Sequence, residues 1–338
     1  MPLSMDAFND DAFSVVNLTE AVNRIPTVPG VITGMNLFSP RPVRSPKIAV
    51  ESKSNTLSIV QTSERGAPRT RRANDKRQIV DLRTRRIEEA SRIDADEVSG
   101  IRAFGSETEL KSLQTEVVQR QQMVMQDLST TRERLYLGAI NGALVDADDS
   151  VIYDYYTTFG FVRPAQIDFQ WATRTGVREF IQANITRPMV RSLGGVAPGG
   201  ARIVALCGDD FFDALTQNSE YRERFKNNEA ASALFENYAF DAIDAFGVTW
   251  INYRGTDDGT SVAIPTAEAR FFMLGVPGLF IEAFSPPPTF DLVNTLGQEW
   301  YSRVLRDPTG RDEWADVELE SHRLPICTRP ESLLQGNL

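Results

Sequence analysis

Residues 106–141 predict a single long helix; they read SETELKSLQTEVVQRQQMVMQDLSTTRERLYLGAIN. Ser106 and Glu109 have the spacing of a capping box, in which two side chains satisfy free N–H groups at the start of a helix. No proline interrupts the chain from there to Gly142. At 1.5 Å per residue, the predicted helix is a rod roughly 50 Å long.

One stripe of this helix is uncharged, with residues spaced three and four apart. Its members are Leu110, Leu113, Val117, Gln121, Val124, Leu128, Thr131 and Leu135. A coiled coil would cover such a stripe, but Gln121 and Thr131 interrupt the seam and the pattern lasts only about four heptads. We therefore expect the helix to pack against a sheet of the same chain.

The first hundred residues lack the sustained apolar pattern that a compact core needs. Prolines break this region repeatedly, at positions 26, 29, 40, 42, 46 and 68. Such a region needs a partner surface. The whole chain, with 338 residues of which 41% are hydrophobic, is long enough to bury at least one full core.

Export and membrane signals are not apparent. The opening MPLSMDAFNDDAF is acidic where a secretory signal would be basic, and the longest apolar stretch, residues 269–284, is interrupted by two glycines, a proline and Glu282. We expect a cytoplasmic product. Cys207 and Cys327 are far apart without metal-ligand spacing, so we expect buried, reduced thiols.

Charge is unevenly distributed. The net charge of −10 argues against a surface that grips nucleic acid all round, yet residues 64–92 hold ten basic and five acidic residues. This segment is either a nucleic-acid patch, which lacks interleaved aromatic residues for stacking on bases, or a clasp between subunits. Arginine outnumbers lysine 31 to 5 in the chain. This ratio fits either the preference of protein interfaces for arginine over lysine or a nucleotide bias of the source genome that replaces lysine codons with arginine codons.

Catalytic patterns are weak. His322 is the only histidine, no G-x-S-x-G motif is present, and GGVAPGG at 194–200 lacks the Lys-Ser/Thr of a phosphate loop, so we interpret it as a turn between strands. Asp209 and Asp210 follow the apolar strand ARIVALC and suit a helix start. An enzyme would place its site between 186 and 284, near these carboxylates and Cys207.

The second half of the chain predicts a mixed α+β lobe. Residues 201–246 alternate strand and helix; GVTWINYRG and SVAIPTAEARFFML look like strands joined by the turn TDDGT. After the prolines of SPPPTF, LVNTLGQEWYSRVL has helical character. The strand-like EWADVELESHRLPICT is expected to return to the layer of the long helix.

Four separated strings carry a family resemblance. They are FSVVNLTEAVNRIPTVPGVITGMNLF, KIAVESKSNTLSIVQTSERGAP, DADEVSGIRAFGSETEL and VELESHRLPICTRPESLL. They resemble, in turn, the opening arm, the extended loop, the approach to the spine helix and the closing strand of the major capsid protein family of lambda-like tailed bacteriophages. The resemblance extends over nearly the full length, although residues 145–280 match mainly in layout.

The resemblance implies an α+β fold of the Hong Kong 97 type. Its expected parts are an N-terminal arm (1–44), an extended loop (45–90), a peripheral domain (91–185) with the spine helix 106–141, an axial domain (186–284) and a return to the peripheral domain (285–338). It implies a structural protein that self-assembles into pentamers and hexamers of an icosahedral head, without catalytic residues, cofactor or metal.

The same resemblance implies partners and a location. Scaffold, portal and decoration proteins are expected, together with weak, non-specific contact to packaged double-stranded DNA and no membrane. The protein would lie in the virion capsid after assembly in the bacterial host cytoplasm. A cytoplasmic enzyme and an arginine-rich nucleic-acid-binding protein remain the alternative functions.

Two groups of residues are predicted to contact neighbouring subunits. The clasp consists of Arg65, Arg69, Arg71 and Arg72. The docking residues of the arm are Phe8, Phe13, Leu18 and Leu37. Arms and loops that bury little within their own chain gain stability by pairing between chains.

Overall fold

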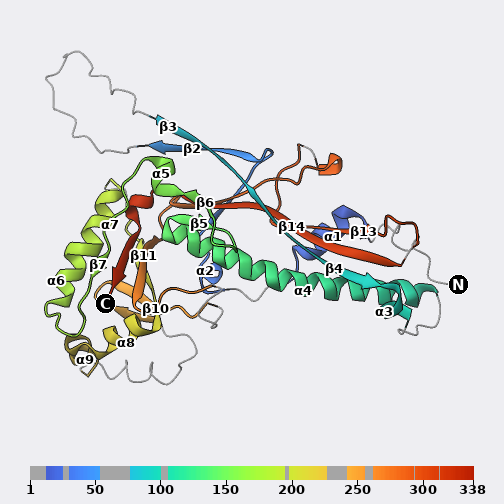
Figure 1. The fold of residues 1–338 in the computed structure, drawn as a ribbon. Coiled ribbons are helices and arrows are strands. Elements are labelled where there is room, and N and C mark those ends of the chain that lie inside the picture. Colours follow the sequence, from blue (N-terminus) through green and yellow to red (C-terminus); the bar gives the residue numbers. More distant parts are fainter. Residues whose placement is uncertain are drawn as a thin grey trace, which may run out of the picture.

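An elongated limb and a compact lobe make up the molecule (Figure 1). The C-terminus lies within the lobe. The computed structural model describes residues 13–25, 30–53, 77–99, 106–194, 198–226, 242–255, 262–292, 294–311 and 313–338.

The limb is built on helix α4 (Ser106–Asn141), the long helix predicted from the sequence. Its 36 residues make a rod of about 54 Å. Val117, Val124, Leu128 and Leu135 of the predicted stripe are buried. Gln121, also in the stripe, is buried as well, and its Nε2 donates a hydrogen bond to the Ser302 hydroxyl at 2.8 Å. The helix packs against a sheet of its own chain, as expected.

That sheet runs along α4 (Figure 1) and is centred on β14 (Trp314–Cys327). Strand β4 (Arg85–Asp94) pairs antiparallel with β14 from Asp94 opposite Trp314 to Arg85 opposite Arg323. The other strands are β13 (Tyr301–Arg306), β12 (Phe280–Phe284) and β1 (Ser39–Pro42). Since β13 pairs with β14 over the same residues as β4, β14 lies between them. The predicted closing strand is therefore an interior strand of the limb sheet.

The lobe contains a six-stranded sheet. Its order is β7 (Ile167–Asp168), β15 (Leu334–Asn337), β11 (Glu268–Leu274), β8 (Arg202–Cys207), β10 (Val248–Asn252) and β9 (Ala242–Ala245). The helices of the lobe are α6 (Val177–Ile181), α7 (Arg187–Ser192), α8 (Asp209–Gln217) and α9 (Ser219–Lys226). Rings of Phe169, Trp171, Phe211, Trp250 and Phe271 stack or meet edge to face in its core.

The remaining helices and strands are short. They are α1 (Val15–Val22), α2 (Val31–Gly34), β2 (Lys47–Lys53), β3 (Arg77–Arg83), α3 (Ala95–Ser99), β5 (Ala143–Val145), β6 (Val151–Asp154) and α5 (Tyr155–Phe159). Single turns of 3₁₀ helix occur at Phe290–Leu292 and Pro330–Ser332, and Gln182–Thr186 forms a π-helical turn. Asp209 and Asp210 open α8, as predicted.

Three local predictions were wrong. The expected helix in LVNTLGQEWYSRVL is not found among the described residues of this stretch: after Leu292, the last residue of a 3₁₀ turn, the chain is irregular until β13 begins at Tyr301, because pairing with β14 overrides a weak helical pattern. The two strands expected to form a hairpin are separated by β8, which is parallel to β10 and antiparallel to β11. The segment 194–200 connects helix α7 with β8 rather than two strands, and TDDGT lies outside the described residues.

The chain passes between limb and lobe more often than the expected domains suggest. Strand β12 falls within the predicted axial span 186–284, yet it belongs to the sheet of the limb. Strand β15 falls within the predicted return 285–338, yet it pairs with β11 in the lobe. The domain boundaries stay a prediction.

Candidate assembly surfaces

Helix α1 is held on the limb by an apolar face. Phe13, Leu18 and Val22 are buried in a cluster with side chains of α4 and of the limb sheet. Two polar contacts fix the position of the helix: the Thr19 hydroxyl accepts from the Ser302 backbone N–H at 3.3 Å, and Asn23 Nδ2 donates to the Trp300 carbonyl at 3.0 Å. The first described part of the N-terminal segment is thus docked on its own chain.

A buried carboxylate on α4 holds the next part of this segment. Glu133 is 6% exposed, and its Oε1 accepts from the Ile32 N–H at 2.7 Å. Its Oε2 accepts from both the N–H (3.1 Å) and the hydroxyl (2.7 Å) of Thr33. These N–H groups belong to the first turn of α2, which has no intrahelical partners for them. The contact therefore acts as a helix cap supplied from another element.

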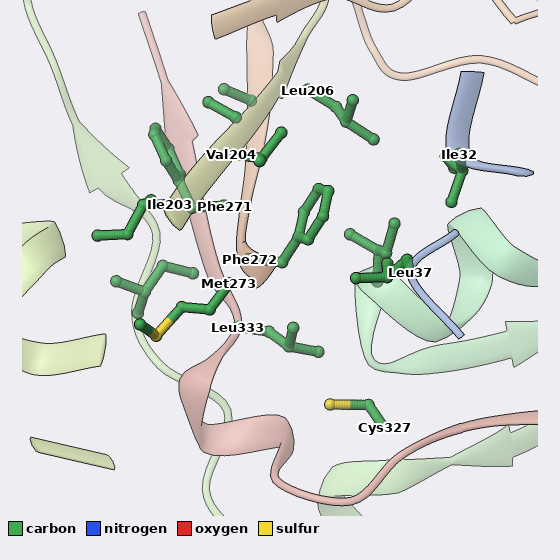
Figure 2. Close-up of a cluster of buried hydrophobic side chains, with 14 of the residues drawn as sticks. Ile32, Leu37, Ile203, Val204, Leu206, Phe271, Phe272, Met273, Cys327 and Leu333 are labelled. Carbon is green, nitrogen blue, oxygen red and sulfur yellow. The ribbon is translucent and has the colours of Figure 1, made fainter. Parts of the chain in front are cut away.

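The same carboxylate reaches the lobe. The Tyr253 hydroxyl, just after β10, lies 3.4 Å from Glu133 Oε1. Burial and the neighbouring charge of Glu133 raise the pKa of Tyr253, so that the phenol stays protonated and can donate. Ile32 and Leu37 enter the same apolar cluster as Phe272 of β11 and Cys327 of β14 (Figure 2). Glu133 thus joins the arm, the limb and the lobe.

Strands β2 and β3 form a separate two-stranded ribbon that runs outward from the junction of limb and lobe (Figure 1). Ile48, Val50 and Leu82 at its base are buried in the main core. The Tyr153 hydroxyl also fixes this base, because it accepts from the Arg83 N–H at 3.1 Å and lies 3.3 Å from the Arg83 carbonyl.

The base of the ribbon is rich in exposed cations. Arg41, Arg44, Lys47 and Arg83 are exposed, and none of the four forms an ion pair with another residue that the structure describes. Lys47 is the direct cross-strand partner of Arg83. Like charges directly opposite each other on a strand pair destabilise it. An acidic partner surface would remove this repulsion.

An ion pair is buried within the limb, between its sheet and α4. Arg323 of β14 is 1% exposed and donates from Nη1 to Glu282 Oε1 at 3.1 Å. The Tyr136 hydroxyl of α4 donates to Glu282 Oε2 at 2.6 Å, and the Arg323 guanidinium lies 4.2 Å from the centre of the Trp300 ring. Burial raises the pKa of Glu282 and lowers the pKa of Arg323, because desolvation disfavours the charged form of each group. The attraction between the two opposite charges acts against this effect. The pair ties β12, β14 and α4 together.

Comparison with known proteins identifies the family. The family model described as phage major capsid protein E matches residues 14–338. The chain belongs to this family. It is therefore a structural protein of the phage capsid and not an enzyme, it assembles into multimeric shells, and its place is the virion capsid.

Individual relatives agree with the family in both sequence and fold. The major capsid protein of Salmonella phage Felix O1 (isolate Felix O1-VT1) is 25% identical over 356 residues, covering 95% of each chain. A crystallised protein of an Escherichia coli CFT073 prophage, assigned to its capsid, has a TM-score of 0.61 at 12% identity, covering 96% of this chain and 98% of that one. The capsid structure of cyanophage P-SCSP1u has a TM-score of 0.54 at 10% sequence identity, and the match covers 93% of this chain and 90% of that one. The α+β fold of the Hong Kong 97 type is thereby confirmed.

The residues predicted to contact neighbouring subunits are only partly described in this capsid protein. Phe13, Leu18 and Leu37 are 7%, 5% and 8% exposed, and their own chain covers them. Their contact with a neighbouring subunit stays a prediction. Phe8 and the clasp of Arg65, Arg69, Arg71 and Arg72 lie outside the described residues.

The residues of the alternative enzyme do not converge on an open site. Burial raises the pKa of the Cys207 thiol, which keeps it protonated and poorly nucleophilic. Asp209, in the first turn of α8, accepts from Asn252 Nδ2 at 2.9 Å. Cys207 and Cys327 are both free and buried, as predicted. Among the described residues, none of the helices has the length and apolarity that crossing a bilayer requires.

The roles of Glu133 and of the pair of Glu282 and Arg323 were not predicted from the sequence. Glu282 carried a signal, since it is the one charged residue near the end of a stretch of strongly apolar strands. Charged residues are seldom fully buried unless they are paired, so a carboxylate in such a stretch predicts a buried partner. Glu133 lies between Arg132 and Arg134, and its position in the sequence does not distinguish it from a glutamate on the solvated face of a helix.

Proposed function

We propose that copies of this chain form the pentamers and hexamers of an icosahedral head that encloses double-stranded DNA. The membership of the major capsid protein E family over residues 14–338 carries this proposal. Its physical basis is repetition, because many weak, identical contacts under closed symmetry add up to a stable shell.

Electron microscopy of the expressed protein tests the proposal. We expect closed shells, or tubes where curvature is not controlled. Small discrete particles at every concentration and salt condition would contradict it, and filaments that form only with added nucleic acid would favour a nucleic-acid-binding protein instead.

The clasp of Arg65, Arg69, Arg71 and Arg72 is proposed to grip an acidic surface of a neighbouring subunit. Its support is the density of arginine in residues 64–92, the bidentate pairing of guanidinium with carboxylate, and the unpaired cations at the ribbon base. Changing all four to glutamate should leave a soluble subunit that forms no shells, whereas changing them to lysine should weaken assembly less. Normal shells from the glutamate variant would refute the clasp.

The arm is proposed to contribute a second inter-subunit contact through Phe8, Phe13, Leu18 and Leu37. Because Phe13, Leu18 and Leu37 are buried on their own chain, this contact would form around them, with the exposed side of α1 facing the neighbour. Val16, which is 63% exposed on that helix, provides an apolar contact point. Val16→Asp should reduce shell yield without changing the melting temperature of the free subunit.

Assembly is proposed to take place in the bacterial host cytoplasm with scaffold, portal and decoration proteins. The net charge of −10 suggests an inner wall that holds packaged DNA weakly, because phosphates bind where positive potential is concentrated. Retention of DNA by opened particles should depend only weakly on salt. A steep loss of retained DNA between low and moderate salt would show instead that many phosphates are neutralised by the wall.

A further inference from the structure

Strand β4 presents a free edge of the limb sheet. In the part of the chain that the structure describes, β4 pairs only with β14, which leaves its other side unpaired. Seven of its ten residues are exposed. The other edge strands of the two large sheets are protected: β1 contains Pro40 and Pro42, α1 packs against β13, and β7 and β9 have only two and four residues. A long, regular edge without proline is a template for another strand.

The backbone groups on this edge belong to alternate residues. The Ala95 N–H, directly after β4, donates to the carbonyl of Glu313, directly before β14, at 2.9 Å. Hydrogen-bonded and non-hydrogen-bonded positions alternate in an antiparallel pair, and β4 pairs with β14 without a shift in register. Every second residue before Ala95 therefore directs its N–H and C=O groups toward either β14 or the free edge. Those that direct them toward the free edge are Arg86, Glu88, Ala90, Arg92 and Asp94.

The side chains of these five residues lie on the face of the sheet opposite α4, because Ile93 on the other face is buried in the cluster with α4. The two arginines reach inward over β14. Arg86 Nε donates to Glu320 Oε2 at 3.0 Å, and Arg92 Nε donates to Asp316 Oδ1 at 3.0 Å. Both arginines are still about half exposed, at 48% and 50%. The ion pairs therefore leave the backbone of the edge open.

We propose that β4 of one copy pairs antiparallel with β4 of a second copy, about a two-fold axis at Ala90. In this register Arg86 lies opposite Asp94, and Glu88 lies opposite Arg92. The symmetry repeats both ion pairs, and the outward backbone groups of the two strands meet. The limb sheets of the two copies then form one continuous sheet. The inference rests on the proposed shell assembly, for which it supplies one specific contact.

The charge pattern of the strand selects this register. A shift by two residues in one direction places Arg86 opposite Arg92, and a shift in the other direction places Glu88 opposite Asp94. Like charges directly opposite each other destabilise a strand pair. A shift by one residue places outward backbone groups opposite residues whose groups already face β14. In the selected register no like charges lie directly opposite each other, so the occupant that fits the edge is a second copy of the same strand.

A two-fold contact has a place in the proposed shell. Icosahedral symmetry contains two-fold axes, at which the same surface of two copies meets. The chain after β4 turns toward α4, because Glu97 of α3 pairs with Arg120 of α4 at 2.7 Å. A single strand pair is a small interface, so repetition over the shell supplies its strength.

Disulfide formation in oxidised shells tests the pairing. Ala90→Cys places two thiols opposite each other across the axis. The Cα atoms of a hydrogen-bonded antiparallel pair are about 5.5 Å apart, within the range that a disulfide spans. We expect a covalent dimer on a denaturing, non-reducing gel, and the native thiols are buried and add no background. Absence of the dimer from intact shells would overturn the proposal.

Glu88→Cys on the same edge is the matched control. In the proposed register, position 88 of one copy lies opposite position 92 of the other. The two copies of position 88 are therefore four residues apart along the strands, roughly 13 Å, which a disulfide cannot span. This variant should give no dimer. A yield equal to that of Ala90→Cys would refute the register and with it the pairing.

A second measurement separates this contact from shell assembly as such. The Ala90 N–H faces the free edge, so Ala90→Pro removes a hydrogen bond to the second copy and none to β14. Both copies lose this bond. The protein concentration needed for shell formation should therefore rise at least about tenfold, while the melting temperature of the free subunit should not change.

Ala90→Thr is the control for this measurement, because threonine keeps the N–H and favours strands. It should form shells at the same concentration as the unmodified chain. If the unmodified chain forms no shells, the proposed function fails. If the unmodified chain and Ala90→Pro form shells at the same concentration, the strand pairing is refuted and the proposed function stands.

Discussion

Replacing Glu133 by alanine should release the N-terminal segment from the limb. The substitution removes the acceptor of three hydrogen bonds from the α2 segment, donated by the Ile32 N–H, the Thr33 N–H and the Thr33 hydroxyl, and of a longer one from the Tyr253 hydroxyl. It leaves α2, a helix of a single turn, without the cap that satisfies its first N–H groups. The affected backbone precedes Leu37 and the start of the limb sheet at β1.

The magnitude follows from the burial of each donor. The Ile32 N–H makes a buried contact, and a buried donor without a partner costs about 1–3 kcal/mol. The two Thr33 donors are part-buried, and the loss of each hydrogen bond costs about 0.5–1.5 kcal/mol because these donors can form hydrogen bonds with water instead. The three bonds share one carboxylate, so their contributions do not add in full. We expect the free energy of unfolding to fall by about 3 kcal/mol.

Urea unfolding and limited proteolysis measure this effect together. The midpoint of unfolding should shift to a lower urea concentration. The protease should cleave within residues 13–38 before it cleaves the lobe. Glu116→Ala is the matched control, because Glu116 lies on the same helix and forms an i,i+4 ion pair with Arg120 at 3.0 Å. That pair contributes only about 0.3–0.5 kcal/mol.

A second variant checks the geometry without removing the carboxylate. A Cβ on Gly30 would overlap the Glu133 carboxyl group, so Gly30→Ala has to displace that group from its donors in the α2 segment. Gly30→Ala should therefore resemble Glu133→Ala in proteolysis. A loss below about 1 kcal/mol for Glu133→Ala, within the usual range of surface substitutions, would refute the assigned role.

Further predictions concern the buried charges and thiols. Arg323→Met should cost about 3–5 kcal/mol, because it leaves Glu282 buried and unpaired, whereas the double variant with Glu282→Leu should recover most of that loss in urea melts. The pKa of Glu320 is lowered, since hydrogen bonding and cationic neighbours outweigh the effect of burial, which raises it. Its contribution to stability is therefore complete above the ordinary glutamate pKa of about 4.3 and is lost as pH falls through the lower folded value. Glu320→Gln should flatten the stability curve in that acidic window. Burial raises the pKa of Cys207 and Cys327, so neither should react with a maleimide in the folded protein and both should react in urea, as mass spectrometry would show.

Much of the limb could be predicted from the sequence because its signals are local. The capping box at Ser106, the absence of proline and the three-and-four spacing determine α4 without reference to the rest of the chain. The closing strand β14 was also predicted from its own residues. Residues 301–305 were misread because their strand conformation depends on pairing with β14, a contact that local propensity does not encode.

The pairing order of the lobe depends on still longer contacts. Strands β10 and β11 are consecutive in the sequence, and a hairpin is the expected connection between such strands. Insertion of β8 between them and arrival of β15 from the C-terminus both require the full chain. Likewise, an isolated sequence cannot show that Glu133 meets the start of α2, a hundred residues away. The junction residues were therefore found only from the structure.

Buried polar groups tie together elements that are far apart in the sequence. Glu133 connects α4 with α2 and Tyr253, and the pair of Glu282 and Arg323 connects β12 with β14 and, through Tyr136, with α4. Such groups are satisfied in one geometry only, and any shift of α4 relative to α2 or to the limb sheet would leave them unpaired in a low-dielectric interior. The limb and the α2 segment should therefore move as one body during assembly. Differences between the environments of the copies in a shell then have to be absorbed by the elements that lack such ties, above all the β2–β3 ribbon and the exposed turn at Phe290.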